Sequence, residues 1–422
     1  MNKELWALRG TLIWAEKPGD MAVLPGGYIL MEGERIKGVS GELPAEYAGA
    51  RVEDCGDSII TPSFSDMHLH APQYPMMGMA MDLQLLEWLQ SYAFPMEARY
   101  EDEDFARLTY KKLAHDLISR GTTRVCIFSS LHRRATNILM DELEAAGVTG
   151  YAGKVNMDRN GGENLQETTA ESIEETLCWI EENKDRRLVK PMLTPRFIPS
   201  CTDELMEALG KIAGEHPEIP AQSHLSENLE EIEWVKQLHP DCTHYYQAYE
   251  KYGLWKEGTV MAHCVYCDEK ERAAMKEAGV WAIHCPDSNT NIASGIAPVR
   301  IMLQEGVKVA MGSDVAGGAK LSMPEAATDA VRVSRLRWLF SGKKEDFLTV
   351  GDVLYLITGA GQEYFGAQPG FGAGDKLHAV VLDDAHLAYN PAITPDRRLE
   401  RIFYQFSPAC VKAVYSEGVR RI

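Results

Sequence analysis

Two closely spaced histidines, His68 and His70, could bind one metal ion. Side chains two residues apart in an extended segment point to the same side, so both imidazoles can reach a common ligand. This pair alone is a weak signal, because packed or surface histidines can have the same spacing. A third imidazole, from His224 or His263, and the carboxylate of Asp314 would complete a set of three nitrogens and one oxygen. Such a set suits Zn²⁺, with Fe²⁺ as an alternative.

A carboxylate follows one of these candidate ligands. In His224-Leu225-Ser226-Glu227 the acid stands three residues after the histidine, at the start of an expected helix. An acid at that place also complements the helix dipole, which is its structural interpretation. Beside a metal site, however, Glu227 can exchange protons with a bound water molecule, and we favour this second interpretation.

The elements that must position these residues are short apolar segments that alternate with longer amphipathic ones. The expected strands are Ile59–Thr61, Arg124–Phe128, Gly150–Val155, Leu188–Leu193, Ile219–Ser223, Thr259–Ala262, Val280–Ile283 and Val307–Met311. The expected helices between them include Ala135–Ala146, Thr169–Asn183, Asp203–Ala213 and Glu269–Ala278. This α/β alternation predicts a (β/α)₈ barrel of the TIM type, with a doubly wound open sheet as the competing topology.

The candidate residues fall at or just beyond the ends of these strands. Barrel enzymes build their sites on that face, so the side chains should converge there. His68 and His70 follow the first expected strand, His224 the fifth and His263 the sixth, while His284 closes the seventh and Asp314 follows the eighth.

The two ends of the chain have a different character, with short strand-like segments separated by Gly, Pro and charged residues. These segments are Leu5–Leu8, Gly27–Met31, Arg35–Val39, Ala379–Leu382 and Val411–Tyr415. We expect residues 1–61 and 366–422 to pair into a small composite β-sandwich domain, and residues 62–365 to form the barrel.

Composition restricts the partners. The 422 residues include 62 acidic and 43 basic side chains, which give a net charge of −19. This charge argues against binding nucleic acid or anionic membranes, but it is compatible with a small neutral substrate. Residues 1–10 lack a basic segment followed by an apolar run, and no stretch of about 18 apolar residues occurs. Nine scattered cysteines favour a reducing cytoplasm over a disulfide framework.

Longer motifs around these residues resemble those of the amidohydrolase superfamily. The superfamily motifs are Pro62–His70, His224, His263, His284–Asn289 and Gly312–Asp314. Further segments are similar to the guanine deaminases within it, namely His70–Tyr74, Leu85–Leu89, Gly153–Asp158, Thr194–Phe197, Gln222–Asn228 and Ser313–Gly318. The order and spacing of so many linked motifs make the resemblance specific, and it extends over nearly the whole chain.

The resemblance implies a zinc-dependent hydrolysis of guanine to xanthine and ammonia, in a homodimer with one Zn²⁺ per subunit, Fe²⁺ being possible. The implied metal ligands are His68, His70, His224 and Asp314, with His263 either a distant fifth ligand or a hydrogen-bond partner of the attacking water. The implied catalytic residues are Glu227, Asp314 and His263. The implied substrate contacts are His70, Gln73, Arg196, Phe197, His224, Glu227 and Asp314.

Other interpretations remain open. The fourth strand ends in Thr194-Pro195-Arg196 and lacks the lysine that closes this strand in two-metal amidohydrolases. A sibling aminohydrolase acting on another purine, a pterin or a triazine is the main alternative, and Arg196 with Gln73 favours guanine, whose carbonyl accepts hydrogen bonds. A catalytically inactive scaffold would have lost metal ligands. The Cys264-Val265-Tyr266-Cys267 motif lacks the preceding proline and the H-x-E of the cysteine-ligated zinc deaminases, so we interpret it as structural.

Overall fold

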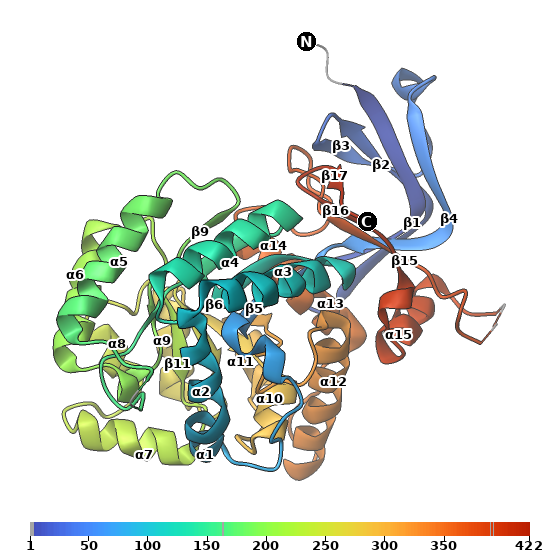
Figure 1. Cartoon of the computed structure of the whole chain (residues 1–422). Coiled ribbons are helices and arrows are strands. Elements are labelled where there is room, and N and C mark those ends of the chain that lie inside the picture. Colours follow the sequence, from blue (N-terminus) through green and yellow to red (C-terminus); the bar gives the residue numbers. More distant parts are fainter. Residues whose placement is uncertain (1–3, 163, 389, 391) are drawn as a thin grey trace.

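Parallel strands alternate with helices through the middle of the chain, and Figure 1 shows helices surrounding them. The computed structural model describes residues 4–162, 164–388, 390 and 392–422. One parallel sheet has the order β5-β6-β7-β9, a second has the order β11-β12-β13-β14, and β8 pairs with β10. These strands are β5 (Phe64–His70), β6 (Thr122–Phe128), β7 (Thr149–Gly153), β8 (Val155–Asn156), β9 (Val189–Pro191), β10 (Thr194–Pro195), β11 (Gln222–Leu225), β12 (Val260–His263), β13 (Trp281–His284) and β14 (Lys308–Met311).

The helices confirm the amphipathic segments expected from the sequence. Those of seven or more residues are α3 (Glu103–Ser119), α4 (Arg133–Ala146), α5 (Thr169–Asn183), α6 (Asp203–Glu215), α7 (Leu229–Leu238), α9 (Glu269–Ala278), α11 (Val299–Glu305), α12 (Met323–Phe340), α13 (Val350–Ile357) and α15 (Pro395–Tyr404). The short ones are α1 (Leu85–Trp88), α2 (Phe94–Ala98), α8 (Gln247–Glu250), α10 (Pro286–Asn291) and α14 (Gly359–Tyr364), with single turns η1 (Ala45–Tyr47), η2 (Ala71–Met76), η4 (Arg99–Glu101), η5 (Ile198–Ser200), η6 (Pro408–Cys410) and the π-turn η3 (Leu89–Ala93).

Local signals explain why helices begin and end where they do. At the start of α5 the Thr168 hydroxyl accepts a hydrogen bond from the Glu171 N–H, and the Glu171 carboxylate accepts one from the Thr168 N–H. This reciprocal capping satisfies two backbone groups that the helix leaves without partners. Helix α9 ends at Gly279, whose φ of 71° is left-handed and suits a residue without a side chain.

The position of the first expected barrel strand is wrong. Residues Ile59–Thr61 belong to β4 (Arg51–Pro62), which pairs with β1 (Leu5–Lys17) and β15 (Ala379–Leu382). Strand β4 alternates between two cores, because Ile59 packs with the middle of the chain and Ile60 with the terminal segments. The strand that pairs with β6 is β5, so His68 and His70 lie within it rather than after it.

The two four-stranded sheets meet at both of their edges. On one side Leu193, which follows β9, forms a parallel bridge to Ala221, which precedes β11. On the other side the Asp314 N–H donates to the His68 carbonyl at 2.8 Å, directly after β14. Gly312 permits this approach, since a Cβ there would lie 2.7 Å from the His68 carbonyl oxygen. The last residues of β14 are thereby held against the histidines of β5.

Strands from both ends of the chain form one seven-stranded sheet, which lies to one side of the helices in Figure 1. Its order is β17-β16-β15-β4-β1-β2-β3, and its remaining strands are β2 (Asp20–Glu32), β3 (Arg35–Ser40), β16 (Val411–Ser416) and β17 (Val419–Arg420). The sheet has a buried cluster of its own, around Leu8, Ile29 and Val381. A packing of two layers, as in a sandwich, stays a prediction. Among the described helices, none is both long and apolar enough to cross a membrane.

Candidate active site

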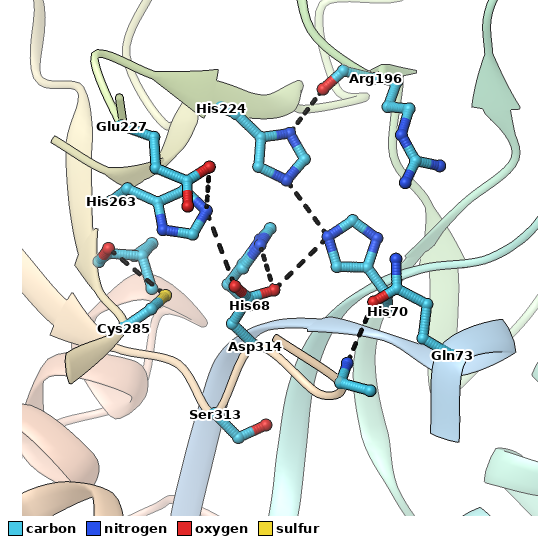
Figure 2. Close-up of polar contacts among 12 residues, drawn as sticks. His68, His70, Gln73, Arg196, His224, Glu227, His263, Cys285, Ser313 and Asp314 are labelled. Atoms are coloured by element: carbon cyan, nitrogen blue, oxygen red, sulfur yellow. Dashed lines mark hydrogen bonds and ion pairs between the residues drawn. The ribbon is translucent and has the colours of Figure 1, made fainter. Parts of the chain in front are cut away.

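Four imidazoles and one carboxylate converge where the parallel strands end, and Figure 2 shows them pointing at a common centre. His68 and His70 come from β5, His224 from β11 and His263 from β12, and Asp314 stands three residues beyond β14. All five are buried. The side chains that the sequence places at separate strand ends therefore meet in one cluster.

The distances within the cluster suit a bound cation. Nε2 of His68 lies 3.2 Å from Oδ1 of Asp314, and Nε2 of His70 lies 3.5 Å from the same oxygen. Nε2 of His70 is also 3.1 Å from Nε2 of His224. Neither ring nitrogen of His68 has a hydrogen-bond partner, although both are buried. Nitrogen and oxygen donors that face one point without satisfying one another fit a divalent ion between them.

Outer contacts fix the orientation of two of these rings. Nδ1 of His224 lies 2.5 Å from the Arg196 carbonyl, and Nδ1 of His263 lies 2.9 Å from Oδ1 of Asn289. A proton on each Nδ1 makes both hydrogen bonds and leaves the Nε2 lone pairs directed at the cluster. The sequence motif contains Asn289 but does not reveal this role.

The electrostatics favour neutral His68, His70 and His224 and an ionised Asp314, whereas the charges of Glu227 and Asp314 outweigh burial and raise the pKa of His263. Burial and the neighbouring imidazoles lower the pKa of His70 and of His224 well below its usual value. Burial acts to raise the pKa of Asp314, but contact with His68 and the other histidines outweighs it and holds that pKa well below its usual range. Neutral imidazole and ionised carboxylate are the forms that bind metals.

Two residues of the cluster have strained backbones. His263 has a φ of 73° and Asp314 a φ of 47°, in the left-handed region that residues with a side chain rarely adopt. Each such residue costs roughly 1–2 kcal/mol of conformational energy. Strain of this kind is held in place by the surrounding structure, and it is typical of functional sites.

Glu227 lies beside the cluster and is 3% exposed. Its Oε2 is 3.4 Å from Nε2 of His263, and its Oε1 accepts a hydrogen bond from the Ser294 hydroxyl at 2.9 Å. Burial raises the pKa of Glu227 to about 7. The carboxyl group can therefore hold or release a proton near neutral pH.

The expectation that Glu227 starts a helix needs correction. Helix α7 begins at Leu229 with Asn228 as its cap, and the acid that accepts the backbone N–H groups of Glu227 and Asn228 is Glu231. The helix-dipole interpretation thus applies to Glu231. Glu227 stands before the helix and points instead towards His263 (Figure 2).

A narrow cavity of about 30 Å³ adjoins the cluster. Segments far apart in the sequence line it, and they include all seven residues expected to contact a substrate. Its lining residues are His70, Gln73, Leu85, Trp88, Leu89, Arg196, Phe197, His224, Glu227, Glu231, His263, Ile292, Asp314 and Gly317. Apolar side chains thus share the lining with the histidines and carboxylates.

Glu97, a residue that sequence reasoning missed, holds two of the candidate substrate contacts. Both Nη atoms of Arg196 donate to its carboxylate, Nη2 at 2.8 Å. Nε2 of Gln73 donates to the same carboxylate at 2.7 Å, and Oε1 of Gln73 accepts from the Ala316 N–H at 3.0 Å. Glu97 lies on α2 and is 1% exposed. Its only signal in the sequence is the need of a buried arginine for a counter-charge.

Other residues singled out from the sequence lie outside the cluster. His284 closes β13 and is buried, but it belongs to neither of the candidate metal groups found among the described residues. The same holds for Cys264 and Cys267, which are buried free thiols. The site therefore uses His68, His70, His224, His263 and Asp314.

Known proteins share this sequence and fold. The amidohydrolase family model matches residues 59–421. A guanine deaminase of Dictyostelium discoideum is 33% identical over 407 residues, which cover 90% of this chain and 89% of the relative. One of Mus musculus is 40% identical over 328 residues, covering 76% and 72%. The crystal structure of a guanine deaminase from C. acetobutylicum, with guanine bound in its active site, matches with a TM-score of 0.96 and 38% identity, covering 99% of this chain and 100% of the other.

Proposed function

The chain belongs to the amidohydrolase family and, within it, to the guanine deaminases, and from this membership we propose that it hydrolyses guanine to xanthine and ammonia. The observation that carries the proposal is the convergence of His68, His70, His224 and Asp314 beside the buried acid Glu227. Histidine and carboxylate donors next to a group that can transfer protons are what a hydrolytic deamination requires.

The metal that the family implies fits the cluster. His68, His70, His224 and Asp314 would hold one divalent ion, and His263 would be a more distant ligand or a hydrogen-bond donor to the attacking water. We propose Zn²⁺, since imidazole and carboxylate suit it, and Fe²⁺ is the alternative. When bound, such an ion would lower the pKa of a water molecule and supply the nucleophile at neutral pH.

Two acidic residues of the chain would accept and donate the protons of the reaction. Oδ2 of Asp314 lies 3.8 Å from Nε2 of His263 and is placed to take a proton from the attacking water. Glu227, on the other side of His263, would give its proton to a ring nitrogen of guanine, then take the proton of the hydroxyl group added at C2 and pass it to the departing amine. The proton held by Asp314 would then return to Glu227, so that both acids regain their starting forms. Water adds to C2, the bond from C2 to the amine breaks, and ammonia leaves with xanthine as the other product.

Arg196 and Gln73 would select guanine by hydrogen bonding. Each Nη of Arg196 keeps a second hydrogen beyond the one donated to Glu97, so the guanidinium can still donate to the guanine carbonyl. Adenine carries an amine at that position, and the Arg196 hydrogens that Glu97 does not accept would then be left without an acceptor. Phe197 adds an apolar surface for the ring.

Guanine entry requires side-chain movement, because a space of about 30 Å³ holds only one or two water molecules. Trp88 and Leu89 line the cavity and lie at the junction of α1 and the π-turn η3. A π-turn is a weaker helical geometry than the α-helix. We propose that this segment moves outward to admit the base.

Three further features belong to the same proposal. The two parallel sheets, joined through Leu193 and Asp314, would form a closed (β/α)₈ barrel over residues 62–365, with residues 1–61 and 366–422 as a separate β-sandwich domain. The enzyme would be a homodimer, with the exposed Phe340 and its neighbours Leu336 and Leu339 on α12 as candidate contacts. It would lie in the cytoplasm, in keeping with its nine free cysteines. Analytical ultracentrifugation tests the dimer.

An ammonia-release assay tests the substrate. Purified protein is offered guanine, adenine, a pterin and an aminotriazine, with xanthine followed by its absorbance. We expect turnover of guanine, and a loss of roughly 100-fold in kcat/KM for Arg196→Met because a charged donor to the base is removed. Arg159→Met, on a neighbouring loop outside the cavity, is the control. Turnover of another ring without turnover of guanine would assign the chain to a sibling reaction.

Metal analysis separates the enzyme from an inactive scaffold. About one equivalent of zinc or iron in the purified protein, with activity lost on chelation and restored by adding the metal, supports catalysis. A protein that lacks metal, takes up none and still folds would be a scaffold.

A further inference from the structure

A second and wider cavity, of about 590 Å³, lies at the opposite ends of the strands. Arg124 is the third residue of β6, whose last residue, Phe128, packs against His70 at the active site. Gly150 stands near the start of β7. The remaining walls come from the seven-stranded sheet and from the segment after α14. The lining residues are Arg35, Arg124, Thr149, Gly150, Tyr151, Arg187, Leu188, Lys190, Phe365, Gly366, Ala367, Asp375, Lys376, His378 and Glu417.

The cavity is cationic in a strongly acidic protein. Five of its lining residues are lysine or arginine and two are carboxylates, whereas the whole chain carries a net charge of −19. Arg187 and Lys190 stand at its exposed rim and Arg124 is buried. Cations concentrated in a cavity with low-dielectric walls attract anions.

Arg124 lacks the partner that a buried arginine normally has. Its side chain is among the buried residues at 5% exposure, and its Nη1 atom has no hydrogen-bond partner. Burial lowers the pKa of Arg124 to about 10, and Asp375 and Glu417 oppose this shift only through their charges, without a hydrogen bond. A guanidinium taken out of water without a partner is costly, so an acceptor is expected there.

The two carboxylates are occupied elsewhere. Glu417 accepts from Lys376, and its Oε1 lies 3.1 Å from Nε2 of His378. Oδ2 of Asp375 accepts from the Gln368 N–H at 2.9 Å. Within the described residues, Asp375 and Glu417 therefore act on Arg124 only through their charges and accept no hydrogen bond from it, so an external anion is left as the acceptor.

We propose that this cavity binds a phosphoryl group through Arg124, with Lys190 and Arg187 at the entrance. A guanidinium matches two phosphate oxygens at once, and several nearby cations suit a charge of about −2 better than a single carboxylate. The cavity is much larger than free phosphate and falls in the range of sites for small organic ligands. Tyr151 and Phe365, stacked with ring centroids 5.7 Å apart, offer an apolar wall for the rest of a phosphate ester.

Calorimetric titration of the full-length protein tests the site with two probes, inorganic phosphate and ribose 5-phosphate, in chloride at matched ionic strength. We expect saturable binding of at least one probe, weakened tenfold or more in Arg124→Met. Arg107→Met, an exposed arginine paired with Glu142, should bind like the wild type. Lys190→Met, at the exposed rim, should weaken binding by a smaller factor, and it serves if Arg124→Met does not fold.

Each outcome either identifies the class of ligand or contradicts the proposal. Tighter binding of ribose 5-phosphate assigns the cavity to a phosphorylated small molecule, and equal or tighter binding of inorganic phosphate assigns it to the free ion. In either case the probe, at equal concentration, should raise the unfolding temperature of the wild type by more than that of Arg124→Met. Absence of saturable binding, or unchanged affinity in both cavity variants, would overturn the proposal, and neither result bears on guanine turnover.

Discussion

Buried charged groups lie at both ends of the parallel strands, on β5, β11 and β12 at one end and on β6 at the other, and the two ends balance that charge differently. At the carboxyl ends, histidines surround the ionised Asp314, and the donor atoms lie within 4.8 Å of one another in each of two groups, His68, His70 and His224, and His68, His263 and Asp314. At the amino ends, Arg124 and the other cations line a cavity of about 590 Å³ in which both carboxylates are already bonded.

The difference indicates what each end can bind. Lone pairs that converge on a small space need a cation between them, whereas separated N–H donors around a large space need an anion. Left-handed backbone at residues other than glycine occurs at both ends, at His263 and Asp314 on the first and at Glu417 on the second, so backbone strain does not separate them. Tight geometry is required to orient a reacting molecule, but it is not required to bind a charged group.

The largest effect should follow Asp314→Asn. The change keeps the side-chain shape but removes the negative charge of the cluster, so metal affinity should fall and guanine turnover should decrease by at least about 1,000-fold. Mass spectrometry for metals and the ammonia assay measure the two losses. Asp141→Asn, an exposed acid paired with Arg186, is the control. A variant with full metal content and near-normal turnover would remove Asp314 from the cluster.

Glu97→Gln should have the next largest effect. It weakens the support of Arg196 and Gln73 without touching the metal ligands, so kcat/KM should fall by roughly 10–100-fold, mainly through KM, with unchanged metal content. Steady-state kinetics with circular dichroism as a folding check measure this. Glu101→Gln, one turn away and exposed, should change neither parameter. Loss of metal together with activity would mean that Glu97 supports the whole site instead.

His378, in the cavity at the amino ends of the parallel strands, should make the free energy of unfolding depend on pH. Burial, followed by the charge of Arg124, lowers the pKa of His378 to about 4. Below its unfolded pKa of about 6.5, the unfolded chain binds a proton that the folded chain does not. The free energy of unfolding should therefore be fully retained above pH 6.5 and should fall by up to about 3 kcal/mol as the pH drops to 4.

Denaturant unfolding of the wild type and of His378→Asn at several pH values measures this contribution. For each protein the free energy of unfolding is plotted against pH, and the contribution of His378 is the difference between the two slopes. His378 and Lys376 lower the pKa of Glu417 to about 2, so the unfolded chain takes up a proton at this carboxyl group only below about pH 5, and the two proteins are compared between pH 5 and pH 7. Equal slopes in the two proteins would show that His378 takes up its proton while folded.

The smallest effect should come from a site remote from both ends. Thr168→Ala removes the cap of α5 and should lower the free energy of unfolding by about 1 kcal/mol, with metal content and guanine turnover unchanged. Chemical unfolding and the ammonia assay test this. A drop in guanine turnover would mean that a loss of stability alone alters the active site. The losses of turnover in Asp314→Asn and Glu97→Gln would then have to be corrected for their own losses of stability.

The sequence by itself determined the alternation of strands and helices and the identity of the clustered side chains. It also predicted the first and last residues of α5 and α9 correctly. Hydrophobic periodicity and capping residues are local signals, and histidines at strand ends are visible because parallel strands bring their ends together. The expected position of Ile59–Thr61 in the barrel was wrong because the signal is local: an apolar segment predicts a strand but not the sheet that the strand joins.

Only the tertiary structure decided which groups face one another. The contact of Glu97 with Arg196 joins residues 99 positions apart, and no local pattern marks an acid on a short helix as its partner. The missing partner of Arg124 is likewise a property of the assembled cavity, because whether a charge is satisfied depends on every segment packed around it. Residue types and their order therefore predict the chemistry, while long-range packing decides the geometry and the unsatisfied groups.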